Sequence, residues 1–156
     1  MKTIKALVLI LVTVVLINGK SHAHCEIPCG IFEDSVRVSL LYEHIVTIEK
    51  SMKKIKELQA AENVDYNQLV RWIMNKEEHA KKMQEIVAQY FMHQRIKPVD
   101  ETEKERYEKY IEQLTSLHEI AIFAMKSKQS TDEVYIKKMR AAVHDFEHAY
   151  FHTHKH

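Results

Sequence analysis

The fold follows most directly from the stretch LLYEHIVTIEKSMKKI, residues 40–55. Its apolar side chains alternate between spacings of four and three residues, and they are Leu41, Ile45, Ile48, Met52 and Ile55. In a helix of 3.6 residues per turn, this spacing gathers them into one stripe and leaves the charged residues on the other face. The stretch therefore predicts an amphipathic helix that packs against a core.

Three later segments show the same periodicity. Their stripes are Leu69, Ile73, Ala80, Met83, Val87 and Tyr90; then Tyr107, Ile111, Leu114, His118, Ala121 and Met125; then Met139, Val143, Phe146 and Tyr150. In the second stripe Lys76 falls in the gap, and in the third we expect His118 to find a hydrogen-bond partner in the core. The pattern predicts four helices, at residues 35–62, 66–95, 101–127 and 131–152.

Helix-start signals stand where these segments need them. Asp34 is a candidate N-cap for the first helix. The later helices follow pairs with capping-box spacing, namely Asp65 with Gln68, Asp100 with Glu103, and Ser130 with Glu133. Pro98 ends the second helix. Short links between four long helices favour an all-α, antiparallel up-down four-helix bundle at residues 34–152, preceded by an N-terminal hook at residues 24–32.

The first 23 residues differ from the rest. Lys2 and Lys5 precede an apolar-rich run over residues 6–17, and small residues stand at Ser21 and Ala23. Twelve helical residues rise about 18 Å, which is too short for the roughly 30 Å core of a membrane. The pattern is typical of a secretory signal peptide at residues 1–23, cleaved after Ala23. We therefore expect an exported protein, periplasmic or secreted, with a mature chain at residues 24–156.

Charge limits the partners of that mature chain. Removing residues 1–23 takes away three lysines and leaves 20 basic residues against 22 acidic ones, with no basic block. Nucleic acid and, after processing, membrane are not expected partners. A di-iron bundle is also disfavoured, because it needs Glu-x-x-His on two helices and no glutamate here is followed by a histidine three residues later.

The mature N-terminus would read His24-Cys25-Glu26-Ile27-Pro28-Cys29-Gly30. His24 offers a free α-amine and an imidazole, Cys25 a peptide nitrogen and a thiolate, and Cys29 a second thiolate. Amine, deprotonated amide and two thiolates make a plane of four donors, with the imidazole placed to cap it. Planar sites with strong nitrogen donors suit Ni(II) or Cu(II), whereas structural zinc prefers a tetrahedron. Because two thiolates tend to reduce Cu(II), nickel is favoured, and His24, Cys25 and Cys29 are the predicted metal ligands and catalytic residues.

His-Cys-x-x-Pro-Cys-Gly at a processed N-terminus resembles the nickel-binding hook of nickel superoxide dismutases, and residues 24–30 match it at every defined position. The resemblance extends, less specifically, over the whole mature chain. It implies an enzyme that disproportionates superoxide, one nickel ion per subunit, a homohexamer and a cis Ile27–Pro28 peptide bond.

The resemblance also points to residues around the metal. The family usually has a tyrosine two residues after the hook glycine, where this chain has Phe32, and it has a second-helix tyrosine near the nickel, which corresponds to Tyr90. A glutamate and an arginine steady the axial imidazole in the family, whereas direct counting places Leu40 and His79 at those positions. Glu43 is a possible substitute for the glutamate.

Two other interpretations remain open. An exported nickel- or copper-binding protein could use the same hook without turnover. A structural bundle could instead join Cys25 to Cys29 in a disulfide, although so small a loop would stabilise little. The histidine-rich end is either a further nickel-binding segment or a solvated terminus, and its members are His144, His148, His152, His154 and His156.

Overall fold

The computed structural model describes residues 32–151. Within this range the α-helices are α2 (Asp34–Gln59), α3 (Tyr66–Glu85), α4 (Lys104–Gln129) and α5 (Val134–Phe151). The π-helix η1 (Ile86–Arg95) continues α3 without a break. All four predicted helices are present, and their ends differ from the predicted ones by at most three residues.

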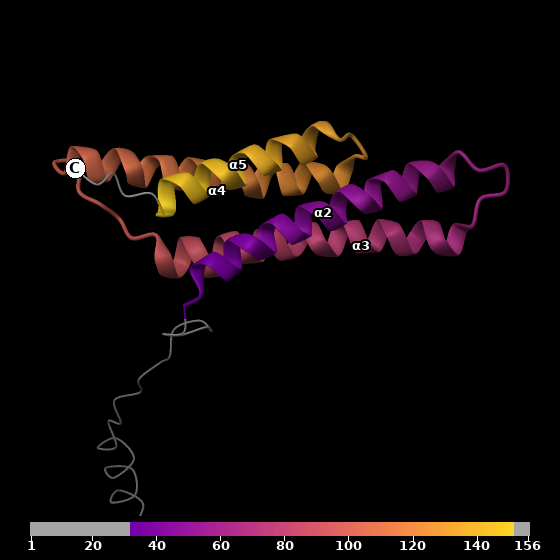
Figure 1. Cartoon of the computed structure of the whole chain (residues 1–156), viewed down its shortest axis with the longest axis horizontal. Coiled ribbons are helices and arrows are strands. Elements are labelled where there is room, and N and C mark those ends of the chain that lie inside the picture. The colour runs from indigo at the N-terminus through magenta and orange to yellow at the C-terminus, as the bar shows by residue number, and fades with distance from the viewer. Residues whose placement is uncertain (1–31, 152–156) are drawn as a thin grey trace, which may run out of the picture. The chain divides into compact units, whose positions relative to one another are not determined.

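The helices form an antiparallel four-helix bundle (Figure 1). α2 packs against α3 and α5, and α4 packs against α5 and α3. This arrangement confirms the fold class predicted from the helical periodicity. None of the helices described between residues 34 and 151 has both the length and the hydropathy that a membrane span requires.

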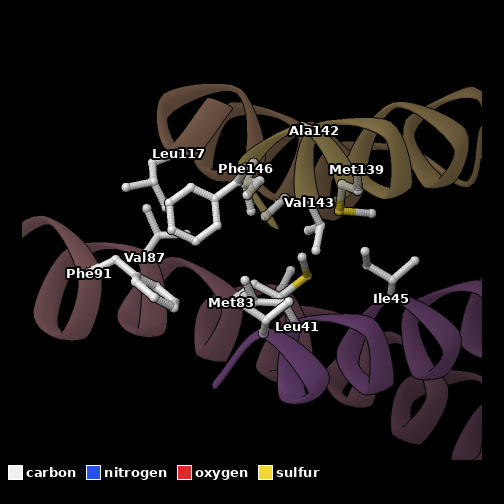
Figure 2. Close-up of a cluster of buried hydrophobic side chains, with 14 of the residues drawn as sticks. Leu41, Ile45, Met83, Val87, Phe91, Leu117, Met139, Ala142, Val143 and Phe146 are labelled. Carbon is white, nitrogen blue, oxygen red and sulfur yellow. The ribbon is translucent and has the colours of Figure 1, made fainter. Parts of the chain in front are cut away.

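The core lies between the apolar stripes, and Figure 2 shows part of it where α2, the α3–η1 segment and α5 meet. The whole predicted stripe of α2 is buried, as are Met139, Val143 and Phe146 of α5. Phe91 of η1 is also fully buried and packs edge-on against Phe146, with ring centroids 4.7 Å apart. The predictions for the first and last helices are therefore confirmed.

The predicted stripe of α4 is confirmed only in part. Leu114 and Ala121 are partly buried against the core, whereas His118 and Ile111 are exposed. The fully buried apolar residues of α4 are Leu117, Ile120 and Ala124. Residues 120–124 read Ile-Ala-Ile-Phe-Ala, and a continuous apolar run fits more than one helical face. Spacing alone could not choose the buried face here.

The second stripe is confirmed only in its later part. Ala80, Met83 and Val87 are buried, but Ile73 is 38% exposed. The α2–α3 connection reaches beyond the α4–α5 connection in Figure 1, so the first turns of α3 have fewer helices to pack against.

The predicted helix starts are partly confirmed. Asp65 caps α3 by accepting a hydrogen bond from the Gln68 N–H at 3.0 Å. α4 and α5 begin three residues later than predicted. Asp100 makes a turn with Thr102 instead of a cap, and Asp132 accepts the hydrogen bond from the Val134 N–H.

Lys76 is buried, with its ammonium group at the end of α4. Its Nζ donates to the carbonyl oxygens of Ser127 at 2.7 Å, Lys128 at 2.6 Å and Ser130 at 3.2 Å. The last carbonyls of a helix lack partners within the helix and carry partial negative charge, which a cation satisfies. Burial lowers the pKa of Lys76, and the nearby Glu77 partly offsets that effect. Lys76 therefore joins α3 to the end of α4.

We expect Lys76→Met to lower the free energy of unfolding by about 2–3 kcal/mol, because it removes charged hydrogen bonds and leaves buried acceptors unpaired. Denaturant unfolding monitored by circular dichroism measures this. The matched control is Lys81→Met on the same helix, where the lysine is exposed and the change should stay within about 0.5 kcal/mol. Equal effects of the two substitutions would show that the contacts of Lys76 do not stabilise the bundle.

Candidate metal centre

The predicted ligands His24, Cys25 and Cys29 lie outside the described residues. Within residues 32–151 there is no group of three or more His, Cys, Asp or Glu side chains that could hold a metal ion. The first described residue, Phe32, follows Cys29 by three positions, and three residues of chain span at most about 11 Å. The surroundings of Phe32 are therefore the part of the described structure tied most closely to the hook.

Phe32 contacts Tyr90 of η1. The two rings meet edge to face with centroids 6.0 Å apart, a favourable geometry for aromatic pairs. Tyr90 is 3% exposed and Phe32 is 39% exposed. The structure thus brings together the two residues that the family resemblance placed near the metal, although they are 58 positions apart in sequence.

Glu43 is not part of this cluster. It lies nine residues beyond Asp34, or about 13 Å further along α2, in an exposed shallow groove beside Tyr42 and Thr47. His79 lies on α3 and pairs with His44 of α2, with their Nδ1 atoms 3.0 Å apart. Burial lowers the pKa of both imidazoles. Within the described residues, neither Glu43 nor His79 contacts Phe32 or Tyr90.

Asp34 does not cap α2, contrary to the prediction. Glu33 holds the N-cap position and makes no side-chain cap, while Asp34 is the first helical residue. The Asp34 carboxylate instead accepts hydrogen bonds from the phenol of Tyr90 at 2.6 Å and the phenol of Tyr150 at 2.8 Å. It also binds Arg95 through Nε at 3.0 Å and Nη2 at 2.7 Å. A two-pronged, charge-assisted pair is stronger than a cap made to a neutral N–H, so the carboxylate turns towards the guanidinium.

The π-helix explains how Tyr90 and Arg95 reach the same carboxylate. In an α-helix, residues five apart point about 140° away from each other. In a π-helix the hydrogen bond joins residues five apart and places them on successive turns of one face. The Ile96 N–H makes such a bond to the Phe91 carbonyl at 2.9 Å. The wider turn thus directs two side chains of η1 onto Asp34, a feature that apolar periodicity did not reveal.

Two guanidinium groups cover the aromatic pair. The Arg95 Cζ lies 4.2 Å from the centre of the Phe32 ring, and the Arg37 Cζ lies 4.9 Å from the centre of the Tyr90 ring. Both distances are typical of cation–π contacts. We define the aromatic–arginine cluster as Phe32, Asp34, Arg37, Tyr90 and Arg95.

The ionisation states in this cluster follow from its contacts. Burial alone would raise the pKa of Asp34, but hydrogen bonds from Arg95, Tyr90 and Tyr150 hold it below its ordinary value. Burial and the bond to Asp34 raise the pKa of Tyr90, and the same two causes raise the pKa of Tyr150 to about 12. At neutral pH the carboxylate is charged and both phenols keep their protons. The single O–H of Tyr90 is therefore committed to Asp34.

We expect Asp34→Asn to lower the free energy of unfolding by about 1–3 kcal/mol at pH 7, because it removes the charged acceptor. The pKa of Asp34 is lower in the folded state, so the unfolded chain takes up the proton first as the pH falls. The contribution of Asp34 is thus present above about pH 4 and disappears at lower pH. Denaturant unfolding between pH 3 and 7 should show the two proteins converging at low pH, with exposed Asp145→Asn as the control. A constant difference across this range would contradict the charged role of Asp34.

One comparison with known proteins gives a match. The family model for nickel-containing superoxide dismutase matches residues 19–155, which include the hook and the described bundle. No curated protein and no solved structure gives a match. With the match covering most of the sequence, the chain belongs to the nickel-containing superoxide dismutase family.

Proposed function

We propose that the mature chain begins at His24 and disproportionates superoxide with a nickel ion held by the hook. The observation that carries this proposal is the family match, because it spans the hook and the bundle as one continuous segment. The reaction converts two superoxide ions and two protons into dioxygen and hydrogen peroxide.

The donor set of the hook fits nickel. The α-amine and imidazole of His24, the amide nitrogen and thiolate of Cys25 and the thiolate of Cys29 would hold the ion. Strong anionic donors favour the higher oxidation state of a metal, and planar sites that include strong nitrogen donors favour nickel over zinc. When bound, nickel supplies a Ni(II)/Ni(III) couple that exchanges single electrons with superoxide. One ion per subunit is the stoichiometry we propose.

The described residues that follow the hook in sequence would supply part of its surroundings. Phe32 would present an apolar ring there, and the buried ring of Tyr90 contacts it edge to face. The ion pair between Asp34 and Arg95 holds η1 against the start of α2, where the chain leaves the hook. In this proposal Phe32 and Tyr90 would shape the small-anion pocket.

An alternative function is metal binding without turnover, by an exported nickel- or copper-binding protein. One observation favours it: Phe32 has no hydroxyl, and the phenol of Tyr90 already donates to Asp34. Neither residue therefore has an O–H to give to a substrate in the described arrangement. Measuring nickel content and dismutase activity on the same preparation distinguishes the two functions.

Export and assembly form part of the same proposal. We propose that the signal peptide takes the chain to the periplasm or the outside medium, and that six copies assemble into a homohexamer. Light scattering on the processed protein measures the assembly, and cell fractionation measures the location.

We expect Cys25→Ser and Cys29→Ser each to abolish nickel binding and dismutase activity, because each removes one of the two thiolates. Elemental analysis and a superoxide decay assay measure the two properties. Ile27→Val is the matched control within the hook, since its side chain offers no donor, and it should keep both properties. Full activity in either serine variant would disprove the assignment of the ligands.

The position of cleavage gives a second test. If Ala23 is retained, the free amine moves one residue away and the His24 nitrogen becomes an ordinary amide. We expect the native chain to begin at His24 by mass spectrometry, and the chain extended by Ala23 to show negligible dismutase activity at equal nickel supply. Both forms contain the same bundle, so their unfolding transitions should coincide. Equal activity in the two forms would mean that the amine is not a ligand.

A further inference from the structure

A pair of histidines joins α2 to α3 at the edge of the core. The Nδ1 atoms of His44 and His79 are 3.0 Å apart, and the two rings meet edge to face with centroids 5.0 Å apart. Both side chains are half-buried, and each is followed in the sequence by a fully buried residue, Ile45 on α2 and Ala80 on α3. The pair therefore lies on the seam between the two helices, directly beside their apolar contact.

The hydrogen bond between these rings holds one proton between the two Nδ1 atoms. A neutral imidazole carries its proton on one of its two nitrogens, so one ring donates through Nδ1–H and the other accepts through the lone pair of its Nδ1. A first added proton can bind Nε2 of the donor ring, which leaves this bond intact and strengthens it by charge. A second added proton must bind the Nδ1 of the acceptor ring. That step replaces the bond by two N–H groups that face each other.

Two charged imidazoles at this separation also repel each other, because water screens a half-buried pair less than an exposed one. The carboxylates of Glu43 and Glu78 favour the charged rings, whereas the ammonium group of Lys82 opposes them and is itself 3.6 Å from Glu78. In the described part of the chain, no charged group of α4, η1 or α5 acts on either ring. Burial is the largest effect and lowers the pKa of both histidines, so the neighbouring carboxylates do not compensate a second charge.

We propose that His44 and His79 form a proton-operated contact, which is closed while the pair carries at most one added proton and opens when both rings are charged. On opening, α2 and α3 separate locally at the seam, where water then reaches Ile45 and Ala80. Because the ordinary pKa of histidine is about 6.5, the change falls in the mildly acidic range. Neither nickel nor superoxide takes part in this step, so it can be tested whether or not the chain is a dismutase.

The first test measures how the equilibrium constant for unfolding depends on pH. The folded chain resists the second proton, whereas both histidines of the unfolded chain accept one, so stability is lost as the pH falls below about 6.5. One extra proton on the unfolded state raises this constant about tenfold per pH unit, and we expect His44→Gln to lose that increment. Glutamine can still form a hydrogen bond with His79 but takes up no proton. The control His118→Gln removes an exposed histidine of α4 and should keep the wild-type dependence.

The second test uses the wild type alone, so it does not depend on how a variant folds. The nitrogen NMR signals of the imidazoles and the exchange of backbone amides are followed from about pH 8 to about pH 4.5. We expect the pair to titrate in two steps that are about one pH unit or more apart. Corrected for the intrinsic pH dependence of exchange, the protection of the Ile45 and Ala80 amides should fall about tenfold or more at the second step. The amide of Phe146, which is buried on α5, should keep its protection.

Three results would overturn the proton-operated contact. In the first, both rings titrate in a single step at the ordinary pKa of histidine. In the second, two steps occur but the amides at the seam keep their protection, because the contact then stays closed. In the third, His44→Gln and His118→Gln unfold with the same dependence on pH. Circular dichroism checks that both variants fold, and if His44→Gln does not, the two measurements on the wild type decide.

Discussion

The carboxylate of Asp34 connects parts of the bundle that are distant in sequence. It stands at the first turn of α2 and binds Tyr90 and Arg95 of η1 and Tyr150 near the end of α5. Each bond is charge-assisted and partly shielded from water, so its strength exceeds that of a surface ion pair. A polar contact at the edge of the apolar core therefore fixes the position at which the chain enters the bundle.

The π-helix is the backbone adjustment that makes this contact possible. Regular α-helical geometry would send Tyr90 and Arg95 to different faces. The wider turns of η1 bring them together while keeping Phe91 in the core against Phe146. π-Helices often mark functional sites, and here the distortion occurs in the segment that packs on Phe32. The backbone hydrogen bonds of η1 are less regular than those of an α-helix, but its Tyr90 and Arg95 supply three of the four donor groups that bind Asp34.

The sequence predicted the helices well, because apolar periodicity directly reports which residues are excluded from water. Ile45, Met83 and Phe146 were placed in the core on that basis, and each is buried. The prediction failed where the pattern is ambiguous or the interaction is polar. The apolar run of α4 fits several faces, so His118 was misplaced. An aspartate is a common N-cap residue, so the sequence predicted that role for Asp34. Its actual role, as the acceptor for Arg95 and two phenols, depends on where those groups lie in the fold. Lys76 interrupts an apolar stripe, and its buried role depends on where α4 ends.

For the candidate site too, one part could be predicted from the sequence and another could not. The ligand set His24, Cys25 and Cys29 is readable from sequence because the donors are neighbours in the chain, so their geometry depends little on the fold. The surroundings of that set come from distant segments. Tyr90 was identified only through the family resemblance, and Arg37 was not identified at all, since a lone arginine on a charged helix has no distinctive spacing. Its surroundings come from distant segments as well: the phenol of Tyr90 donates a hydrogen bond to Asp34, and Asp34 neutralises Arg95. The contact between Arg37 and the Tyr90 ring, with Cζ 4.9 Å from the ring centre, depends on how η1 packs against α2, and the spacing within either segment does not reveal it.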